Sequence, residues 1–210
     1  MSISEKLFVF SFMFSFMFSF VFSLVFSLVC GHWCVVFGVA ARAGGVIEYR
    51  MAGQQSKHAK WPEGLHFSVL WSGVAAGTRG RLARFGDLPG SPSRRELSVV
   101  STAVADAFQG EQATEVVAVL DEYTQALLRF DTAHRLGIFD AGHRALAERA
   151  AGAGIVYKPC GAGGGDIGVA LATNRASLAS FETIAARSGF SRIALSIDPS
   201  GAMLHDKDET

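Results

Sequence analysis

The pattern of hydrophobic and polar positions separates an apolar opening stretch from a remainder with mixed helix and strand patterns. Between Leu7 and Ala41 there is no Lys, Arg, Asp or Glu, whereas charged residues are interspersed among apolar ones from Ala43 onward. We therefore divide the chain into an apolar Phe/Ser-rich segment over residues 1–42, a globular domain over residues 43–204 and a charged tail over residues 205–210.

Helical periodicity is clearest in the middle of the globular part. After Ser93, which has the S-x-x-E spacing of a capping box with Glu96, apolar residues share one face of a predicted helix that Gly110 ends. The residues of that face are Leu97, Val100, Val104 and Phe108. A second helix carries Val116, Leu120, Tyr123, Leu127 and Phe130 at spacings of three and four.

Two further helices and several short strands complete the pattern. One helix spans about residues 140–151, and the other, ended by Gly189, is capped by Thr173 or Asn174. The predicted strands cover residues 46–50, 65–71, 154–157, 167–171 and 193–197. Residues 52–62 read as a polar loop, and residues 72–92 as a surface segment rich in Gly, Arg and Pro. Strands separated by helices predict an α+β layered sandwich.

The apolar opening stretch is long enough to cross a membrane. From Leu7 to Val29 it repeats as FSFM, FSFM, FSFV, FSLV and FSLV, and a helix needs about 20 apolar residues to span a bilayer. One interpretation is a transmembrane or signal-anchor helix, with membrane association through residues 7–41. Lys6 and Arg42 flank it evenly, so its orientation stays open.

Two other interpretations of this stretch remain open. Its strict four-residue period is typical of an expanded short DNA repeat or a reading-frame error. Phe also occupies every even position from Phe8 to Phe22, which is the period of a β-strand. Cys30, His32 and Cys34 are one ligand short of a tetrahedral metal site, so no metal is assigned.

Charge and cysteine content exclude several classes of function. The 19 basic and 19 acidic side chains leave no excess charge for a nucleic acid or an acidic membrane surface. Three cysteines do not make a disulfide framework, which favours a reducing, cytoplasmic setting for the globular domain.

A glycine-rich stretch is the strongest candidate for a functional site. It runs Lys158-Pro159-Cys160-Gly161-Ala162-Gly163-Gly164-Gly165-Asp166 between two predicted strands. Glycine permits positive φ and close backbone approach to a ligand, and successive N–H groups in such a loop can bind an anion. Neither a Walker A loop nor a Rossmann loop fits, because each of those opens a helix.

Three segments resemble the GHMP kinases, the small-molecule kinases of galactose, homoserine, mevalonate and phosphomevalonate. KPCGAGGGDIGVAL, from Lys158, is similar to the third motif of that family, and its GAGGGD form most resembles the phosphomevalonate kinase branch. GGVIEYR, from Gly44, and FSVLWSG, from Phe67, resemble two strand segments that precede the motif. The likeness covers about residues 43–201.

The resemblance implies a fold, an activity and a set of ligands. It implies the C-terminal GHMP kinase domain, an open, mostly antiparallel sheet covered by helices. It also implies phosphoryl transfer from ATP with Mg²⁺ to a phosphorylated small molecule, as in isoprenoid precursor synthesis. The residues expected to bind phosphate or nucleotide are Gly161, Ala162, Gly163, Gly164, Gly165 and Asp166. Lys158 and Arg79 suit an anionic substrate, with solvated surface groups as the alternative.

The chain also departs from the family pattern. The family's N-terminal glycine loop, P-x-x-x-G-L-G-S-S, has no match, and no acidic residue precedes Gly44 within the apolar stretch. We therefore expect a truncated kinase that is inactive alone, and we assign no catalytic residue. The alternative is a non-catalytic, membrane-tethered domain that binds an anionic metabolite or a partner. His134, Asp140, His143 and Cys160 are weaker candidates, read first as helix-end, surface or packing residues.

Overall fold

Two antiparallel sheets and four helices make up the part of the chain that the computed structural model describes, which comprises residues 6–13, 19–23, 43–50, 55–76, 91–161 and 163–200. The predicted α+β class and the mostly antiparallel sheet structure are confirmed. The strands, however, are divided between two separate sheets of four, and every strand pairing is antiparallel.

The first sheet has the strand order β2-β1-β3-β4. Its members are β1 (Lys6–Met13), β2 (Ser19–Ser23), β3 (Val46–Arg50) and β4 (Gln55–Ala59). β1 pairs with β3 in the register Phe8↔Glu48 and Phe10↔Val46. This sheet therefore crosses the predicted domain boundary at residue 42, and the division of the chain there stays a prediction.

The second sheet, in the order β6-β7-β5-β8, carries the candidate site. Its strands are β5 (His66–Trp71), β6 (Val156–Pro159), β7 (Ile167–Ala172) and β8 (Ser191–Ile193). β6 and β7 form an antiparallel pair, with Val156 opposite Leu171 and Pro159 opposite Gly168. The glycine-rich stretch therefore joins two neighbouring strands, as the sequence predicts.

The helices begin and end at residues suited to those positions. They are α3 (Pro92–Gly110), α4 (Ala113–His134), α5 (His143–Ala151) and α6 (Arg175–Arg187). The side chain of Asn174 accepts from two backbone amides at the start of α6, which confirms its predicted role as N-cap. α3 is capped by Ser91 rather than Ser93, because the Ser91 hydroxyl accepts from the Arg94 amide and Pro92 opens the helix.

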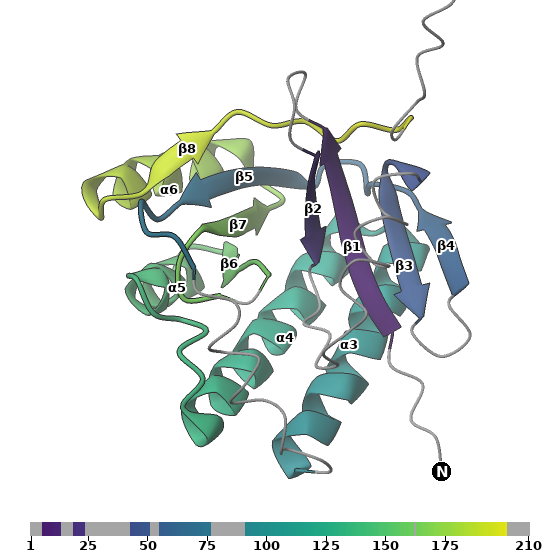
Figure 1. Ribbon diagram of the computed structural model, residues 1–210. Coiled ribbons are helices and arrows are strands. Elements are labelled where there is room, and N and C mark those ends of the chain that lie inside the picture. The colour runs from purple at the N-terminus through teal and green to yellow at the C-terminus, as the bar shows by residue number, and fades with distance from the viewer. Residues whose placement is uncertain are drawn as a thin grey trace, which may run out of the picture.

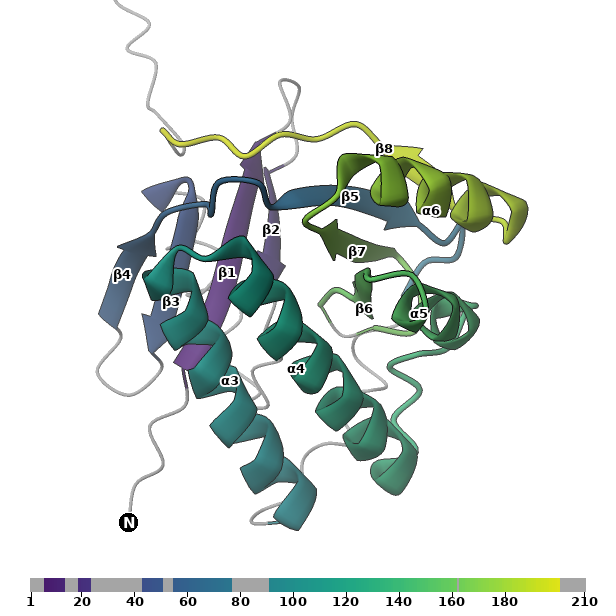
Figure 2. The same ribbon diagram turned by 180° about the vertical axis from the view of Figure 1, so that it is seen from behind.

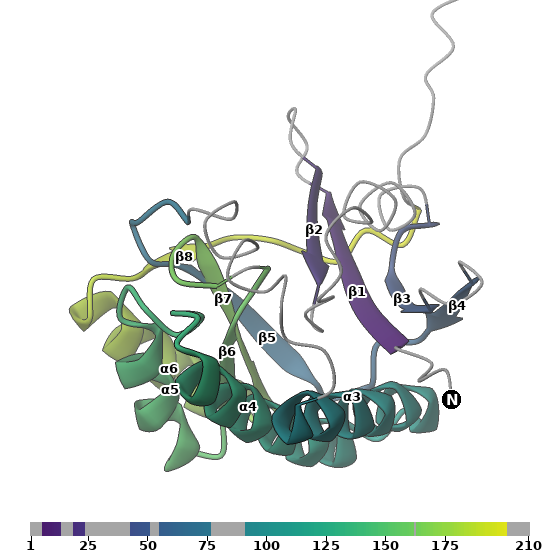
Figure 3. The same ribbon diagram turned by 60° about the horizontal axis from the view of Figure 1, so that its bottom comes forward.

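The helices gather along one side of the molecule and the strands along the other, as Figure 3 shows. In Figure 1 the first sheet lies to the right and the second to the left. Figure 2, seen from behind, shows α3 and α4 side by side in front of β1 and β3, with α5 and α6 over the second sheet. The glycine-rich stretch thus lies in the half of the molecule that α4, α5 and α6 cover.

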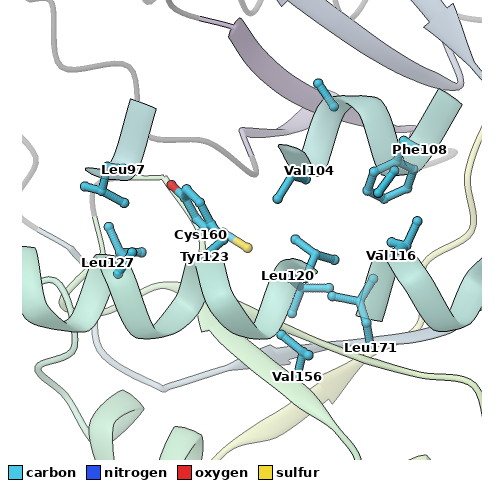
Figure 4. Close-up of a cluster of buried hydrophobic side chains, with 14 of the residues drawn as sticks. Leu97, Val104, Phe108, Val116, Leu120, Tyr123, Leu127, Val156, Cys160 and Leu171 are labelled. Atoms are coloured by element: carbon cyan, nitrogen blue, oxygen red, sulfur yellow. The ribbon is translucent and has the colours of Figure 1, made fainter. Parts of the chain in front are cut away.

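A shared hydrophobic core joins the two long helices to both sheets. Figure 4 shows Val104 and Phe108 of α3 above Leu120 of α4, with Val156 and Leu171 of the second sheet below them. All five side chains are buried. Alternate residues of the same strands, including Leu70 and Tyr157, face a second cluster formed with α5 and α6. The period-two alternation of a strand thus buries both faces of this sheet.

The secondary structure described for the opening stretch does not agree with its interpretation as a membrane helix. Residues 6–13 and 19–23 form the antiparallel pair β1 and β2, which agrees with the alternating Phe positions. No helix in the described ranges combines the length and the apolar character needed to span a bilayer. Membrane association through residues 7–41 is therefore without support. The remaining residues of the repeat, together with Cys30, His32, Cys34 and the tail over 205–210, lie outside the described residues.

Two other predictions were wrong in detail. Part of the predicted loop over residues 52–62 is β4, whose first four side chains are exposed. Such an edge strand is held by backbone pairing to β3 and shows no hydrophobic alternation. The predicted strand over residues 193–197 shares only Ile193 with the observed one, because β8 spans Ser191–Ile193. Leu195 and Ile197 still pack against the main core.

Candidate functional site

The glycine loop is the seven-residue connection from Cys160 to Asp166 between β6 and β7. The Cys160 amide donates to the carbonyl oxygen of Ile167 at 2.9 Å and closes the hairpin at its base. Four residues of the loop have positive φ between 52° and 69°, and Gly165 has a φ of 150°. The residues in the first group are Gly161, Gly163, Gly164 and Asp166. Glycine adopts these conformations at little cost, and Asp is one of the few other residues that tolerate a positive φ.

The middle of the loop packs directly on the segment between α4 and α5. A Cβ atom at Gly163 would lie 2.4 Å from the carbonyl oxygen of Ile138. The Gly163 amide donates to the Cys160 carbonyl at 3.2 Å, and the Gly164 amide donates to the Ile138 carbonyl at 2.7 Å. Gly163 therefore permits close backbone packing, and these two N–H groups are already used within the protein.

The end of the loop is joined to the segment that follows β5. The Asp166 amide donates to the Val74 carbonyl at 2.6 Å, and the Ser72 amide donates to the Asp166 carbonyl at 2.8 Å. The Asp166 carboxylate accepts from the Ala76 amide at 3.1 Å. A Cβ atom at Gly165 would lie 2.7 Å from the Val74 carbonyl oxygen. Asp166 therefore holds the residue 72–76 segment against the loop.

A buried histidine contacts the same part of the loop from α5. His143, the first residue of that helix, is fully buried. Its Nε2 atom lies 3.1 Å from the carbonyl oxygen of Gly165, and its Nδ1 atom lies 2.7 Å from the hydroxyl of Tyr157. His143 is thus a helix-end residue, as predicted, but its ring is in the core and not on the surface.

Asp131 supports the segment on which the loop packs. The residue is 3% exposed, and its carboxylate accepts from the amides of Ile138 at 2.9 Å and Phe139 at 3.3 Å. Arg144 donates to the same carboxylate at 3.3 Å. Three donors, one of them charged, satisfy a carboxylate that would otherwise be costly to bury. Sequence reasoning missed Asp131, because an acidic residue within α4 has no distinguishing local pattern.

Lys158 lies beneath the loop and not at its surface. The residue is 2% exposed, and its Nζ atom donates to the carbonyl oxygen of Pro159 at 2.8 Å. The ammonium group also lies 5.9 Å from the centre of the Tyr123 ring. Burial lowers the pKa of Lys158 from its ordinary value, partly offset by nearby Cys160. The alternative of a solvated surface lysine is therefore wrong, and its substrate-binding role stays a prediction.

Cys160 has the environment of a structural thiol. It is buried beside Tyr123 in the main core, as Figure 4 shows. Burial raises the pKa of the thiol to about 11, although the Lys158 ammonium and a hydrogen bond to the Val169 backbone act in the opposite direction. The thiolate form is therefore scarce at neutral pH, which favours a packing role over a reactive one.

The remaining predicted residues are divided between described and undescribed positions. Ala162 and Arg79 lie outside the described residues. His134 lies at the end of α4, where its Nε2 atom is 3.0 Å from the Ser93 hydroxyl, and Asp140 is exposed. No cluster of three potential metal ligands occurs among the described residues.

Within the loop, Gly161 and Gly165 donate no hydrogen bond to any described residue. Among the loop residues that the structure describes, these two N–H groups have no acceptor; Gly161 is partly exposed, whereas Gly165 is buried.

Comparison with known proteins gives relatives in sequence and in fold. No family model matches the chain. Over 125 residues the chain is 33% identical to the phosphomevalonate kinase of Streptomyces sp. (strain CL190), an alignment that covers 55% of this chain and 33% of the relative. The phosphomevalonate kinase of Streptococcus pneumoniae, in complex with phosphomevalonate and AMPPNP, has the same fold with a TM-score of 0.59. That match is 18% identical and covers 68% of this chain and 42% of the other.

The chain is GHMP kinase-like. Two further solved structures agree with this assignment of the fold. The L. major mevalonate kinase in complex with R-mevalonate matches with a TM-score of 0.61 at 16% identity, over 80% of this chain and 53% of that chain. The Lin0012 protein from Listeria innocua matches with a TM-score of 0.68 at 18% identity, over 77% and 56% of the two chains. The predicted family resemblance and fold are confirmed.

The GHMP kinase-like chain spans only part of each of these proteins. It covers a third of the curated phosphomevalonate kinase and between 42% and 56% of the three solved structures. The similarity therefore supports a kinase-like function in general terms. Substrate, cofactor and activity of this particular chain are proposals.

Proposed function

We propose that the chain supplies the glycine-loop side of the active site of a GHMP-type kinase that uses ATP and Mg²⁺ to phosphorylate a small phosphorylated substrate of the phosphomevalonate type. The observation that carries the proposal is the anchored glycine loop. Its backbone is held by Ile138, Val74 and His143, while the N–H groups of Gly161 and Gly165 have no described acceptor. A rigid backbone with free N–H groups can bind phosphate oxygens without being reorganised first.

The residues present fit a nucleotide phosphate in part. Gly161 faces open space, since a Cβ atom there would meet nothing within 4 Å, and its amide is available. The exposed Asp166 carboxylate lies at the end of the loop, and Mg²⁺ in kinases is commonly held by one or two carboxylates together with the phosphates. When bound, ATP with Mg²⁺ supplies the transferable phosphoryl group and neutralises its charge.

The substrate class follows from the sequence relative. The Streptomyces enzyme is a phosphomevalonate kinase, and the Streptococcus pneumoniae kinase of similar fold binds phosphomevalonate together with AMPPNP. An acidic, phosphorylated substrate requires positive side chains or N–H donors. Arg79 and the loop amides are our candidates for that role. Lys158 joins them only if its ammonium group leaves the Pro159 carbonyl.

We expect the 210-residue chain to bind these ligands without turning them over at ordinary kinase rates. Phosphoryl transfer depends almost entirely on positioning and charge stabilisation. The sequence has no P-x-x-x-G-L-G-S-S loop to hold the nucleotide from the opposite side. A coupled assay with ATP, Mg²⁺ and phosphomevalonate tests this expectation, and sustained turnover would contradict it.

A charge substitution at Gly161 tests phosphate binding directly. Asn and Asp both tolerate positive φ, and the position has room for a side chain. Only Asp introduces a negative charge. We expect Gly161→Asp to weaken AMPPNP·Mg²⁺ binding by about tenfold relative to Gly161→Asn, from one added repulsion at a partly screened site. Calorimetric titration of the full chain measures the difference.

Two results would overturn the proposal. One is the absence of binding of both AMPPNP·Mg²⁺ and phosphomevalonate by the wild-type chain. The other is equal affinity in the Asp and Asn variants, because it would place the ligand away from the loop. No observation favours the alternative of a membrane-tethered domain, since residues 6–13 and 19–23 of its supposed anchor are strands.

A further inference from the structure

We propose that His143 is a positioning residue, which holds the glycine loop in its ligand-binding shape by donating a hydrogen bond to the carbonyl oxygen of Gly165. Tyr157 acts with it by donating a hydrogen bond to the other ring nitrogen, Nδ1. The inference rests on the proposed function, because that function gives the shape of the loop its purpose. Neither residue belongs to the glycine motif.

The hydrogen-bond geometry determines the tautomer of the imidazole. A carbonyl oxygen only accepts, so the Nε2 atom of His143, at 3.1 Å from the Gly165 oxygen, must carry a hydrogen. In the neutral ring Nδ1 is then an acceptor, and the Tyr157 hydroxyl at 2.7 Å donates to it. Burial raises the pKa of Tyr157 well above its usual value, so that hydroxyl keeps its proton. Both ring nitrogens are therefore satisfied.

The peptide group between Gly165 and Asp166 is held at both of its polar atoms. Its carbonyl accepts from His143, and its N–H donates to the Val74 carbonyl at 2.6 Å. Gly165 itself has a φ of 150°, which residues with a side chain seldom adopt. With Gly165 held at this φ, these contacts restrict the directions open to the neighbouring Gly165 N–H, one of the two described loop donors without an acceptor.

A glycine inside β7 makes room for the hydrogen bonds that join Tyr157, His143 and Gly165. Gly168 lies inside β7, where a Cβ atom would be 2.3 Å from the Tyr157 hydroxyl oxygen. Glycine weakens a strand interior and is found where another group approaches the backbone closely. The absence of a side chain at position 168 gives the Tyr157 hydroxyl its place beside His143.

Packing alone does not account for the choice of histidine. The His143 ring makes an edge-to-face contact with Phe190 and stacks near Tyr157, contacts that an apolar side chain could also make. A buried imidazole is unfavourable unless its nitrogens are paired, and here both are paired to groups in or beside the loop. The specific consequence of a histidine is the Nε2–H bond to Gly165.

Two substitutions separate this hydrogen bond from packing. The side-chain amide of His143→Gln can reach the position of Nε2 and donate to Gly165, whereas that of His143→Asn reaches only the position of Nδ1. Hydrogen exchange of the Asp166 amide in the ligand-free, full chain reports how firmly the peptide is held. We expect exchange about tenfold faster in His143→Asn and within about twofold of wild type in His143→Gln.

The affinity for inorganic tripolyphosphate should follow the same order. Equal acceleration in the Gln and Asn variants, or acceleration in neither, would overturn the positioning role and leave packing as the explanation. Should His143→Asn fail to fold, Tyr157→Phe keeps both rings and removes only the hydroxyl that holds the imidazole at Nδ1. Faster Asp166 exchange in that variant supports the proposal, and unchanged exchange overturns it. Wild-type chain that binds no tripolyphosphate would overturn the proposed function, which the exchange comparison does not depend on.

Discussion

Gly163 packs directly against Ile138, so closely that a Cβ atom at position 163 would lie 2.4 Å from the Ile138 carbonyl oxygen. The next amide, that of Gly164, donates to the same oxygen at 2.7 Å. The glycine loop is therefore fixed to the segment between α4 and α5 as well as to its own hairpin. Gly163 is therefore needed for close packing, whereas Gly161 and Gly165 have amides without a described acceptor.

Gly163→Ala should be strongly destabilising. The position has a φ of 69° and no room for a methyl group beside backbone atoms of Ile138. We expect a loss of about 2–4 kcal/mol in the free energy of unfolding, measured by denaturant titration. Gly161→Ala is the matched control, because its φ is similar but the space is open. Its cost should be only about 1 kcal/mol of backbone strain, and equal losses would contradict the packing role.

Asp131→Asn should loosen the segment that supports the loop. The amide side chain lacks the charge that attracts Arg144 and presents an NH₂ group to the backbone donors of Ile138 and Phe139. We expect a loss of about 2–4 kcal/mol in the free energy of unfolding. Asp121→Asn, at an exposed position on the same helix, should change it by less than about 0.5 kcal/mol. Similar values for both variants would show that the carboxylate is not structurally important.

Lys158→Met should stabilise the protein at neutral pH. Burial lowers the pKa of Lys158, so the charged form is less favourable in the folded protein than in the unfolded chain. Replacing such a charge with an apolar side chain of similar length should add about 1–3 kcal/mol to the free energy of unfolding at pH 7. Wild-type stability should rise with pH between the lowered pKa and the ordinary value of 10.5, because the unfolded chain binds more protons there.

The advantage of Lys158→Met should therefore shrink as the pH approaches 10.5. Denaturant titrations at several pH values check this, and an advantage that grows with pH would contradict it. The same variant also tests the substrate role of Lys158. A loss of phosphomevalonate affinity supports that role, and unchanged affinity contradicts it.

Cys160 should resist alkylation in the folded protein. With burial raising its pKa to about 11, roughly one thiol in a thousand is ionised at pH 8, against about one in ten at the reference value of 9.0. We expect iodoacetamide to modify Cys160 at least about a hundredfold more slowly in native than in denatured protein. Peptide mapping by mass spectrometry separates it from Cys30 and Cys34. Rapid labelling of the native protein would show that the thiol is accessible.

The helices were the most predictable part of the fold. The faces predicted for α3 and α4 include Phe108 and Leu120, both of which are buried. Their spacing of three and four follows from local helix geometry, so the sequence carries it directly. β4 was missed for the opposite reason. Its exposed side chains show no alternation, and only pairing with β3 makes it a strand.

The candidate site likewise has features that the sequence predicts and features that it does not. The glycine loop, its strand-to-strand setting and its family likeness could be read from the sequence, because positive φ demands glycine at particular positions. The roles of Asp131 and His143 could not, since each acts on the loop across many intervening residues, and Tyr157 acts on it through His143. Nor could burial of Lys158, because a lysine between apolar residues gives no indication of whether its ammonium group reaches water or a backbone carbonyl.

The sequence by itself thus determined the helices, most strands and the identity of the loop, all of which depend on short-range geometry. Tertiary structure alone decided which amides of that loop are free. Gly163 and Gly164 donate to carbonyl oxygens, one of them supplied by Ile138, while Gly161 and Gly165 have no described acceptor. The physical reason is that a hydrogen bond between distant segments depends on where packing places its acceptor, and no local pattern of residues encodes that position.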